Sequence, residues 1–291
     1  MNPWLLALRP KTLSAAVVPI VVGSALAFQS QHPFVLWVSV CALLASLFIQ
    51  VGTNLFNDAI DYKKGADTHE RIGPLRVTQS GLIKPKSVLL MAVACLIVAA
   101  AFGFPLVMKG GFPILVVGLA SLFLAYSYTG GPFPLAYLGL GDVFVVLFFG
   151  WISVMGLFYL HTEVVSMASF VAGTQVGLLA TVLIAINNLR DFKQDEKAHK
   201  KTLAVRFGQQ FVRLEIYGLN MGAFLLLIYW IAQQHWWAGI LPLLVLPLSL
   251  KVMKGVVENE PGPIYNKFLA MAGAVHLLFG LLLTIGIAIK V

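Results

Sequence analysis

An acidic motif lies at the end of the second long apolar stretch of the sequence. In NLFNDAIDYKKGAD, Asn54, Asp58 and Asp61 are spaced i, i+4 and i+7, and Asn57 adjoins them. On an α-helix this spacing puts the three side chains on one face. An unpaired amide is costly in apolar surroundings, so Asn54 should face the interior of a helix bundle or a hydrated cavity. The end of this helix is therefore a candidate ligand site.

A second motif of the same kind lies near residue 190. In NNLRDFKQDEK, Asn187, Asp191 and Asp195 are spaced i, i+4 and i+8, again on one helical face, and Asn188 is a further polar candidate. Because the second motif repeats the first, we expect the two to converge on a common ligand.

Two such motifs suit a divalent cation that carries a phosphate group. Mg²⁺ prefers carboxylate, carbonyl and water oxygens and bridges to substrate phosphates. Basic residues are interleaved with the acids and are suited to the remaining phosphate oxygens. The candidates for diphosphate binding are Arg71, Arg76, Arg190, Lys200 and Lys201. Since the motifs end apolar segments, the other end of the ligand should be a hydrocarbon, as in an isoprenoid diphosphate.

The composition requires a bilayer as the solvent for most of the chain. Of 291 residues, 59% are hydrophobic and 11% are charged, whereas a soluble domain carries roughly 25% charged residues. We predict an all-α polytopic membrane protein with about nine transmembrane helices, forming a single domain over residues 1–291. The predicted spans are 13–28, 36–57, 88–107, 111–128, 142–160, 165–187, 217–232, 237–253 and 267–289.

The distribution of basic residues predicts the orientation of the chain. All of the 20 Lys and Arg residues except Lys109 and Lys290 fall on the N-terminal side of the first span or in the loops on that same side. Positively charged loops stay in the cytoplasm, so we place the N-terminus inside and the C-terminus outside. This bias also explains the net charge of +8 without a nucleic-acid partner. The two cytoplasmic loops at about 58–87 and 188–216 are long and polar, and we expect them to cap the site.

At these residues the sequence resembles the UbiA superfamily of intramembrane prenyltransferases, and more specifically its menaquinone branch. The resemblance covers nearly the whole chain. It rests on NDAIDYKKGAD, on LRPKT, on RIGPLRVTQSGLI from residue 71, on YSYTGGPFPLAYLGLGD from residue 126 and on KKTLAVRFG from residue 200.

The resemblance implies a UbiA-like helix bundle in the bacterial inner membrane, with the active site facing the cytoplasm. It implies the transfer of a polyprenyl group from polyprenyl diphosphate to 1,4-dihydroxy-2-naphthoate, with loss of CO2 and diphosphate, giving demethylmenaquinone. It also implies Mg²⁺, as two ions, held by Asn57, Asp58, Asp61, Asp67, Asp191 and Asp195. Of these, Asp58, Asp61, Asp191 and Asp195 are expected to be catalytic, while Asn54, Asn187 and Asn188 are expected to support the substrate.

Three further residues have two possible roles each. Tyr126 and Tyr128 end the fourth predicted span, where their rings could stabilise an allylic cation or belong to an interfacial aromatic belt. Asp142 begins the fifth predicted span, where it could contact the acceptor and remove its proton or serve as a capping carboxylate.

Two other functions compete with this hypothesis. An ion-coupled transporter also needs carboxylates in two similar motifs, but transporter sites lie near the membrane midplane, and here the centres of the predicted spans contain no Asp or Glu. A prenyltransferase with another aromatic acceptor, such as 4-hydroxybenzoate or homogentisate, is opposed only by the loop sequences.

Overall fold

The computed structural model describes residues 2–67 and 71–289, and in these ranges all regular secondary structure is helical. The predicted all-α class is therefore confirmed. The first half comprises α1 (Pro3–Leu8), η1 (Pro10–Thr12), α2 (Ser14–Gln29), α3 (Leu36–Lys63), α4 (Pro85–Ser127), α5 (Leu135–Leu138), α6 (Gly141–Val145), η2 (Val146–Ile152) and α7 (Ser153–Thr162). The second half comprises α8 (Met167–Arg190), α9 (Phe192–Lys197), α10 (Leu203–Leu225), α11 (Leu227–Ala232), α12 (Trp236–Ile240), η3 (Leu241–Val245), α13 (Leu246–Glu258) and α14 (Tyr265–Ala288).

Seven helical segments within the described ranges are long and apolar enough to cross a membrane. They are Leu36–Lys63, Pro85–Ser127, Gly141–Thr162, Met167–Arg190, Leu203–Ala232, Trp236–Glu258 and Tyr265–Ala288, and the apolar α2 is shorter, with 16 residues. The chain is thus an integral membrane protein, as predicted, while the number nine stays a prediction.

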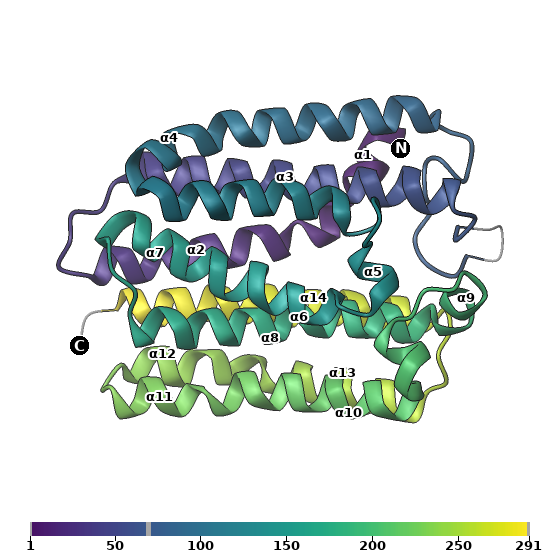
Figure 1. Cartoon of the computed structure of the whole chain (residues 1–291). Helices are drawn as coiled ribbons and strands as arrows, with labels where there is room; N and C mark the ends of the chain where they lie inside the picture. The colour runs from purple at the N-terminus through teal and green to yellow at the C-terminus, as the bar shows by residue number, and fades with distance from the viewer. Residues whose placement is uncertain (1, 68–70, 290–291) are drawn as a thin grey trace.

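Helix α4 contains the turn that the sequence placed between two predicted spans. Its 43 residues would measure about 65 Å if straight, twice the hydrocarbon thickness of roughly 30 Å. Gly111 has φ 68° and ψ −153°, a conformation that side-chain-bearing residues avoid. Figure 1 shows that α4 doubles back on itself beside α3.

Helix α8 forms the centre of the bundle. Of its most apolar segment 72% is buried, against 22–39% for the other six. The main hydrophobic core joins α8 to α2, α7, α10 and α14, through residues such as Val22, Val176, Ile186, Ile216 and Phe279. Because α8 ends in the second acidic motif, this core sets the position of that motif.

Segment η2 is π-helical and packs very closely on α8. A Cβ atom at Gly150 would lie 2.5 Å from the carbonyl oxygen of Gly173 and 2.9 Å from the Cα of Gly177, so only glycine fits at this contact. π-Helical turns in α-helices are frequent at functional sites. Here the turn presents Phe148 and Ile152 to a cavity.

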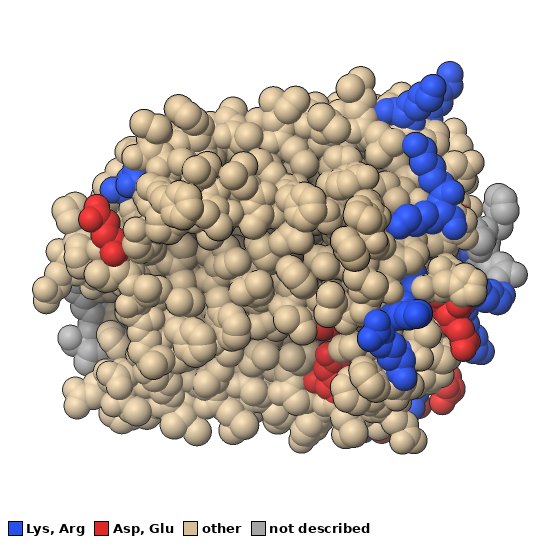
Figure 2. Space-filling view, in the orientation of Figure 1, with Lys and Arg blue, Asp and Glu red and all other residues tan. Residues whose placement is uncertain are grey.

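Charged side chains gather at one end of the bundle. In the face shown in Figure 2 most of them lie at the right-hand end, where α3 ends and α9 follows α8 in Figure 1, and a broad uncharged belt separates them from a small group at the opposite end. Helix α1 lies near the charged end, whereas α14 ends at the other, as an odd number of crossings requires. The cytoplasmic placement of the charged end stays a prediction.

Candidate functional site

Asp58, the first acid of the α3 motif, holds the loop that follows α3. Its buried carboxylate accepts hydrogen bonds from the backbone N–H groups of Val77 and Thr78, at 3.1 and 3.0 Å, and a short one from the Thr78 hydroxyl. The Val77 side chain is fully buried in a small core with Leu55 and Val88. Asp58 therefore anchors residues 76–80 over the end of α3.

Asp61 lies one helical turn further on and collects three donors. The Tyr137 hydroxyl donates to Oδ1 at 2.9 Å, while Lys200 Nζ and Arg76 Nη2 approach Oδ2 at 3.1 and 3.2 Å. Asp61 is 1% exposed. A buried carboxylate that contacts two cations through one oxygen depends on those cations to offset the free-energy cost of burying its charge.

Asp67, the third acid of the first motif, pairs with two arginines. It forms a short ion pair with Arg71 and a second one with Arg76 Nε at 3.2 Å. Burial disfavours the Arg76 charge, but Asp61 and Asp67 outweigh it and raise the pKa of Arg76. Arg76 thus stays charged and ties two of the acids together.

The second motif is built around Arg190, which is 2% exposed. Its Nε and Nη2 donate to the two carboxylate oxygens of Asp191 at 2.8 and 2.7 Å. Nη2 also donates to Asn187 at 2.7 Å, and Nη1 donates to Asn266 of α14 at 2.8 Å. The motif is therefore held in one geometry by a guanidinium whose three nitrogens all donate hydrogen bonds.

The prediction that Asp195 shares one helical face with Asn187 and Asp191 is wrong, because α8 ends at Arg190 and Asp191 leaves the helical conformation. Asp195 lies on the separate short helix α9 and is half-buried. Burial raises the pKa of Asp195 to about 7; Lys200 opposes the shift, and the negative charges of Asp191 and Asp61 add to it. The mutual influence of Asp195 and Asp61 requires that the ends of the two motifs lie close together.

Direct contacts confirm that the two motifs meet. Lys200, which follows the second motif, contacts Asp61 of the first. Asn266 accepts from Arg190 and donates to the carbonyl of Ile72 at 3.1 Å. A Cβ atom at Gly73 would lie only 2.6 Å from Arg190 Nη2, so the first loop packs directly on the second motif.

The donor set has the chemistry of a Mg²⁺ site, although its acids are paired with protein groups. No three His, Cys, Asp or Glu side chains among residues 2–67 and 71–289 are grouped as a metal site. Asp58, Asp61, Asp67 and Asp191 are instead engaged by the bases and backbone N–H groups described above. Carboxylate oxygens in this number fit Mg²⁺, and the paired bases fit the phosphate that accompanies it.

Sequence reasoning missed Tyr137. Lys64 Nζ lies 4.1 Å above the centre of the Tyr137 ring and donates to the Thr129 carbonyl at 2.7 Å, and Lys200 Nζ lies 5.0 Å from the same ring. The Tyr137 pKa is raised by burial and by Asp61. The available signal was the position of Tyr137 inside the YTGGPFPLAY motif.

Arg9 was also missed, although it lies in the LRPKT motif. Its backbone is left-handed, with φ 50°. Burial, together with the charges of Arg76 and Arg71, lowers the pKa of Arg9 to about 9, and its buried Nη2 has no hydrogen-bond partner within the described residues. Arg9 therefore belongs to the basic side of the same cluster and offers a donor to an anion.

The amides of the first motif hold neighbouring segments. Asn54 donates to the Leu8 carbonyl at 3.3 Å and to the Thr12 hydroxyl at 3.0 Å. Asn57 accepts from the Thr129 hydroxyl at 2.9 Å. They fix the N-terminal segment and the α4–α5 loop beside α3.

The remaining predicted residues occupy varied positions. Tyr126 is 42% exposed and packs edge-on against Phe56, whereas Tyr128 lines the cavity described below, and burial raises its pKa. Asp142 is buried in the first turn of α6, makes no capping bond and has one oxygen without a partner among the described residues. Asn188 is half-buried on α8, and the Lys201 side chain is exposed.

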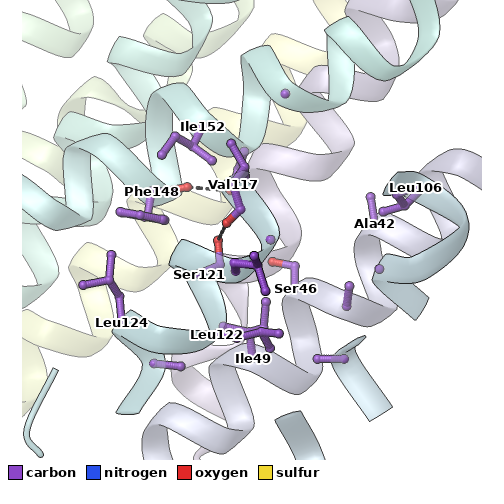
Figure 3. A pocket seen from close by; sticks show the side chains of 18 of the residues that line it. Ala42, Ser46, Ile49, Leu106, Val117, Ser121, Leu122, Leu124, Phe148 and Ile152 are labelled. Carbon is purple, nitrogen blue, oxygen red and sulfur yellow. Dashed lines mark hydrogen bonds between the residues drawn. The ribbon is translucent and has the colours of Figure 1, made fainter. Parts of the chain in front are cut away.

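An apolar cavity of about 440 Å³ begins beside this cluster, between α3, both halves of α4 and the α6–α7 segment. Thr53, one turn before Asn57, lines it at the cluster end. The hydroxyls of Ser46, Ser121 and Ser153 all donate to backbone carbonyls, so they present little free polarity, and Figure 3 shows the Ser121 bond to Val117. The cavity therefore suits a hydrocarbon chain that is attached to a charged head.

Comparisons with known proteins agree with this chemistry. The chain is 37% identical to 1,4-dihydroxy-2-naphthoate octaprenyltransferase of Escherichia coli (strain K12), over 98% of this chain and 94% of that protein. It is 31% identical to the protein of the same name from Bacillus subtilis (strain 168), over 97% of this chain and 91% of that one.

Solved structures share the fold. A UbiA homolog from Archaeoglobus fulgidus bound to GPP and Mg²⁺ aligns with TM-score 0.70 and 18% identity, over 99% of this chain and 100% of that one. An apo UbiA homolog from Aeropyrum pernix K1 aligns with TM-score 0.71 and 14% identity, over 93% of this chain and 97% of that one. The model of the UbiA prenyltransferase family matches residues 16–286, and the chain belongs to that family.

Proposed function

We propose that this protein transfers a polyprenyl group from polyprenyl diphosphate to 1,4-dihydroxy-2-naphthoate, with loss of CO2 and diphosphate. The product is demethylmenaquinone, formed as its quinol. The observation that carries the proposal is the cluster of paired acids and bases around Asp61 at the mouth of an apolar cavity. The names of the relatives that align over nearly their full length support the choice of acceptor.

The paired acids and bases suit an exchange of partners when the donor binds. Without a ligand, Arg76 and Lys200 neutralise Asp61. When magnesium diphosphate binds, the acids gain Mg²⁺ and the bases gain phosphate as new partners of opposite charge. Every buried charge can therefore stay paired. The predicted metal side is Asn57, Asp58, Asp61, Asp67, Asp191 and Asp195, and the phosphate side is Arg71, Arg76, Arg190, Lys200 and Lys201, to which we add Arg9.

Asp58 has a second role in this scheme. Both of its oxygens already accept hydrogen bonds from Val77 and Thr78. It therefore holds the cap in place, and any role in binding the metal requires that one of these bonds be shared or lengthened. Asp61, whose partners are the side chains of Tyr137, Lys200 and Arg76 rather than backbone groups, is better suited to bind a metal directly.

The reaction needs charge stabilisation and the exclusion of water. The bond between C1 of the donor and the diphosphate oxygen breaks with its electron pair on oxygen, and bound Mg²⁺ would stabilise that departing charge. The basic side chains hold the diphosphate, while Tyr128 presents an aromatic face to the cavity. The acceptor carbon that bears the carboxylate bonds to C1, and CO2 leaves with its bonding pair returned to the ring. The packed loops keep out water that would otherwise trap the cation.

We place this site at the cytoplasmic face of the bacterial inner membrane. The support is the gathering of basic residues on the loops at one end of the bundle, together with the bacterial sources of the relatives.

The decisive experiment is product analysis with the purified protein. With 1,4-dihydroxy-2-naphthoate, a polyprenyl diphosphate and Mg²⁺ we expect prenylated, decarboxylated product by mass spectrometry, and none after EDTA treatment. Asp61→Asn should abolish product, whereas Lys254→Gln, a change at a side chain that is 73% exposed, should not. Product from 4-hydroxybenzoate alone would assign the other aromatic acceptor class, and full activity of Asp61→Asn would refute the site.

A further inference from the structure

A second apolar hollow adjoins the cavity that leads away from the acidic cluster. This outer groove has a volume of about 240 Å³ and lies between the second half of α4 and the η2–α7 segment. It shares Ile114, Val117, Ile152 and Gly156 with the larger cavity. Four shared residues from both walls make the two hollows continuous.

The outer groove lies at the end of the cavity that is remote from the charged cluster. Along α4 the lining runs from Tyr128, beside the site, through Ser121 to Ile114. These 14 residues of helix correspond to about 21 Å. Pro113 and Val165 line only the outer groove, so it extends the path beyond that length.

The lining of the outer groove excludes a polar ligand. Trp151 contributes its ring, but its indole N–H donates to the Thr174 hydroxyl at 2.8 Å. Pro113, Met155 and Val165 supply only apolar side chains. Tyr159 adds a phenol ring, and the rest of the lining is apolar or, at Trp151, already hydrogen-bonded, so the groove favours a hydrocarbon occupant.

Gly156 stands at the junction of the two hollows. A Cβ atom at this position would meet nothing within 4 Å, because the space beside it is open. Since the residue lines both hollows, any larger side chain here would enter the passage between them. The absence of a side chain at residue 156 is therefore what joins the two.

We propose that the outer groove binds the distal isoprene units of a long polyprenyl chain and that Gly156 determines which chain lengths are accepted. The proposal rests on the proposed function, since the occupant is the tail of its prenyl donor. A short chain ends inside the cavity, whereas a long one has to pass Gly156. The continuity of the lining from Tyr128 to Val165 selects this occupant over a free membrane lipid.

The test compares the binding of a short and a long donor without acceptor. Equilibrium dissociation constants for geranyl and octaprenyl diphosphate would be measured with Mg²⁺ on the detergent-solubilised full chain. Gly156→Leu should raise the dissociation constant of octaprenyl diphosphate by roughly tenfold or more. The dissociation constant of geranyl diphosphate should stay within about twofold of the wild-type value. Gly156→Ala should have a smaller effect of the same sign. Unchanged binding of the short donor shows that the variant is folded.

Gly218→Leu is the matched control. Gly218 is an exposed helical glycine whose Cβ would also meet nothing within 4 Å, and it lines neither hollow. It should leave the ratio of the two constants unchanged. Equal losses for both donors in Gly156→Leu, or no loss for either, would overturn the proposal and indicate that long tails leave sideways into the bilayer. Failure of the proposed function would show separately, as absence of product from the wild-type protein with 1,4-dihydroxy-2-naphthoate.

Discussion

Lys200 Nζ lies 3.1 Å from Asp61 Oδ2, and this ion pair connects the segment after the second acidic motif to the carboxylate of the first. The side chains are 13% and 2% exposed, so the pair is largely desolvated. In such a setting the loss of one partner costs more than the pair itself contributes. The pair also keeps Lys200, which we propose binds phosphate, within reach of Asp61, which we propose binds the metal.

Replacing Lys200 with Met should therefore damage both stability and function. Asp61 would retain Arg76 and Tyr137, so we expect a loss of about 1–3 kcal/mol in the free energy of unfolding rather than complete unfolding. The KM for the prenyl diphosphate should rise, because one phosphate donor is lost. Thermal unfolding and initial rates would measure the two effects, with the exposed Lys254→Met as control. A variant with wild-type KM would contradict the assignment of Lys200 to the diphosphate.

The Thr78 hydroxyl tests the role of Asp58 as an anchor for the cap. Thr78→Val keeps the backbone N–H bond to Asp58 and removes only the hydroxyl, whose acceptors are the carboxylate and the backbone carbonyl of Asp58. We expect about 1 kcal/mol of local destabilisation and faster proteolysis of the 64–84 loop, with a smaller change when Mg²⁺ and diphosphate are bound. Thr181→Val is the control, since that hydroxyl donates to Gly177 within α8. Unaltered cleavage of the loop would show that Val77 and the backbone hydrogen bonds hold the cap in place without the Thr78 hydroxyl.

Arg9 should lower the stability of the ligand-free protein and strengthen the binding of the prenyl diphosphate. Its charge lies near Arg76 and Arg71, so Arg9→Met should relieve repulsion and raise the melting temperature of the ligand-free protein. The same change should raise KM for the prenyl diphosphate several-fold because the Nη2 donor is removed. A lower melting temperature combined with an unchanged KM would refute this view of Arg9.

Asp195 should make Mg²⁺ binding depend on pH near neutrality. Its pKa is raised from 3.8 to about 7, so in the metal-free protein the carboxyl is protonated below that value. A metal needs the carboxylate, so Mg²⁺ affinity should increase from about pH 6 to pH 8. By linkage, the metal-free fold should lose stability as pH rises from about 4 to about 7, because the unfolded chain ionises first, and the loss should level off above about 7. Calorimetric titration measures the Mg²⁺ affinity at each pH, and unfolding of the metal-free protein measures its stability, each with Asp195→Asn as comparison. An equal pH dependence in the variant would assign the titration to another group.

Much of the fold and the outline of the site could be predicted from the sequence because both depend on local periodicity. Apolar runs of bilayer length predicted a helical membrane protein, and the gap between the predicted spans 88–107 and 111–128 predicted the break in what the structure shows as α4. The spacing of Asn54, Asp58 and Asp61 predicted that the first motif occupies one helical face of what the structure shows as α3. The same prediction failed for the second motif, which is divided between the end of α8 and α9.

Tertiary structure alone decided how the charges are paired. Asp58 accepts from residues 19 and 20 positions later, and Asp61 binds Lys200 at a separation of 139 positions. Tyr137 and Arg9 gain their importance only from these neighbours. Side-chain chemistry and helical spacing are written in the local sequence, but the partner of a buried charge and the open space beside Gly156 depend on how distant helices pack.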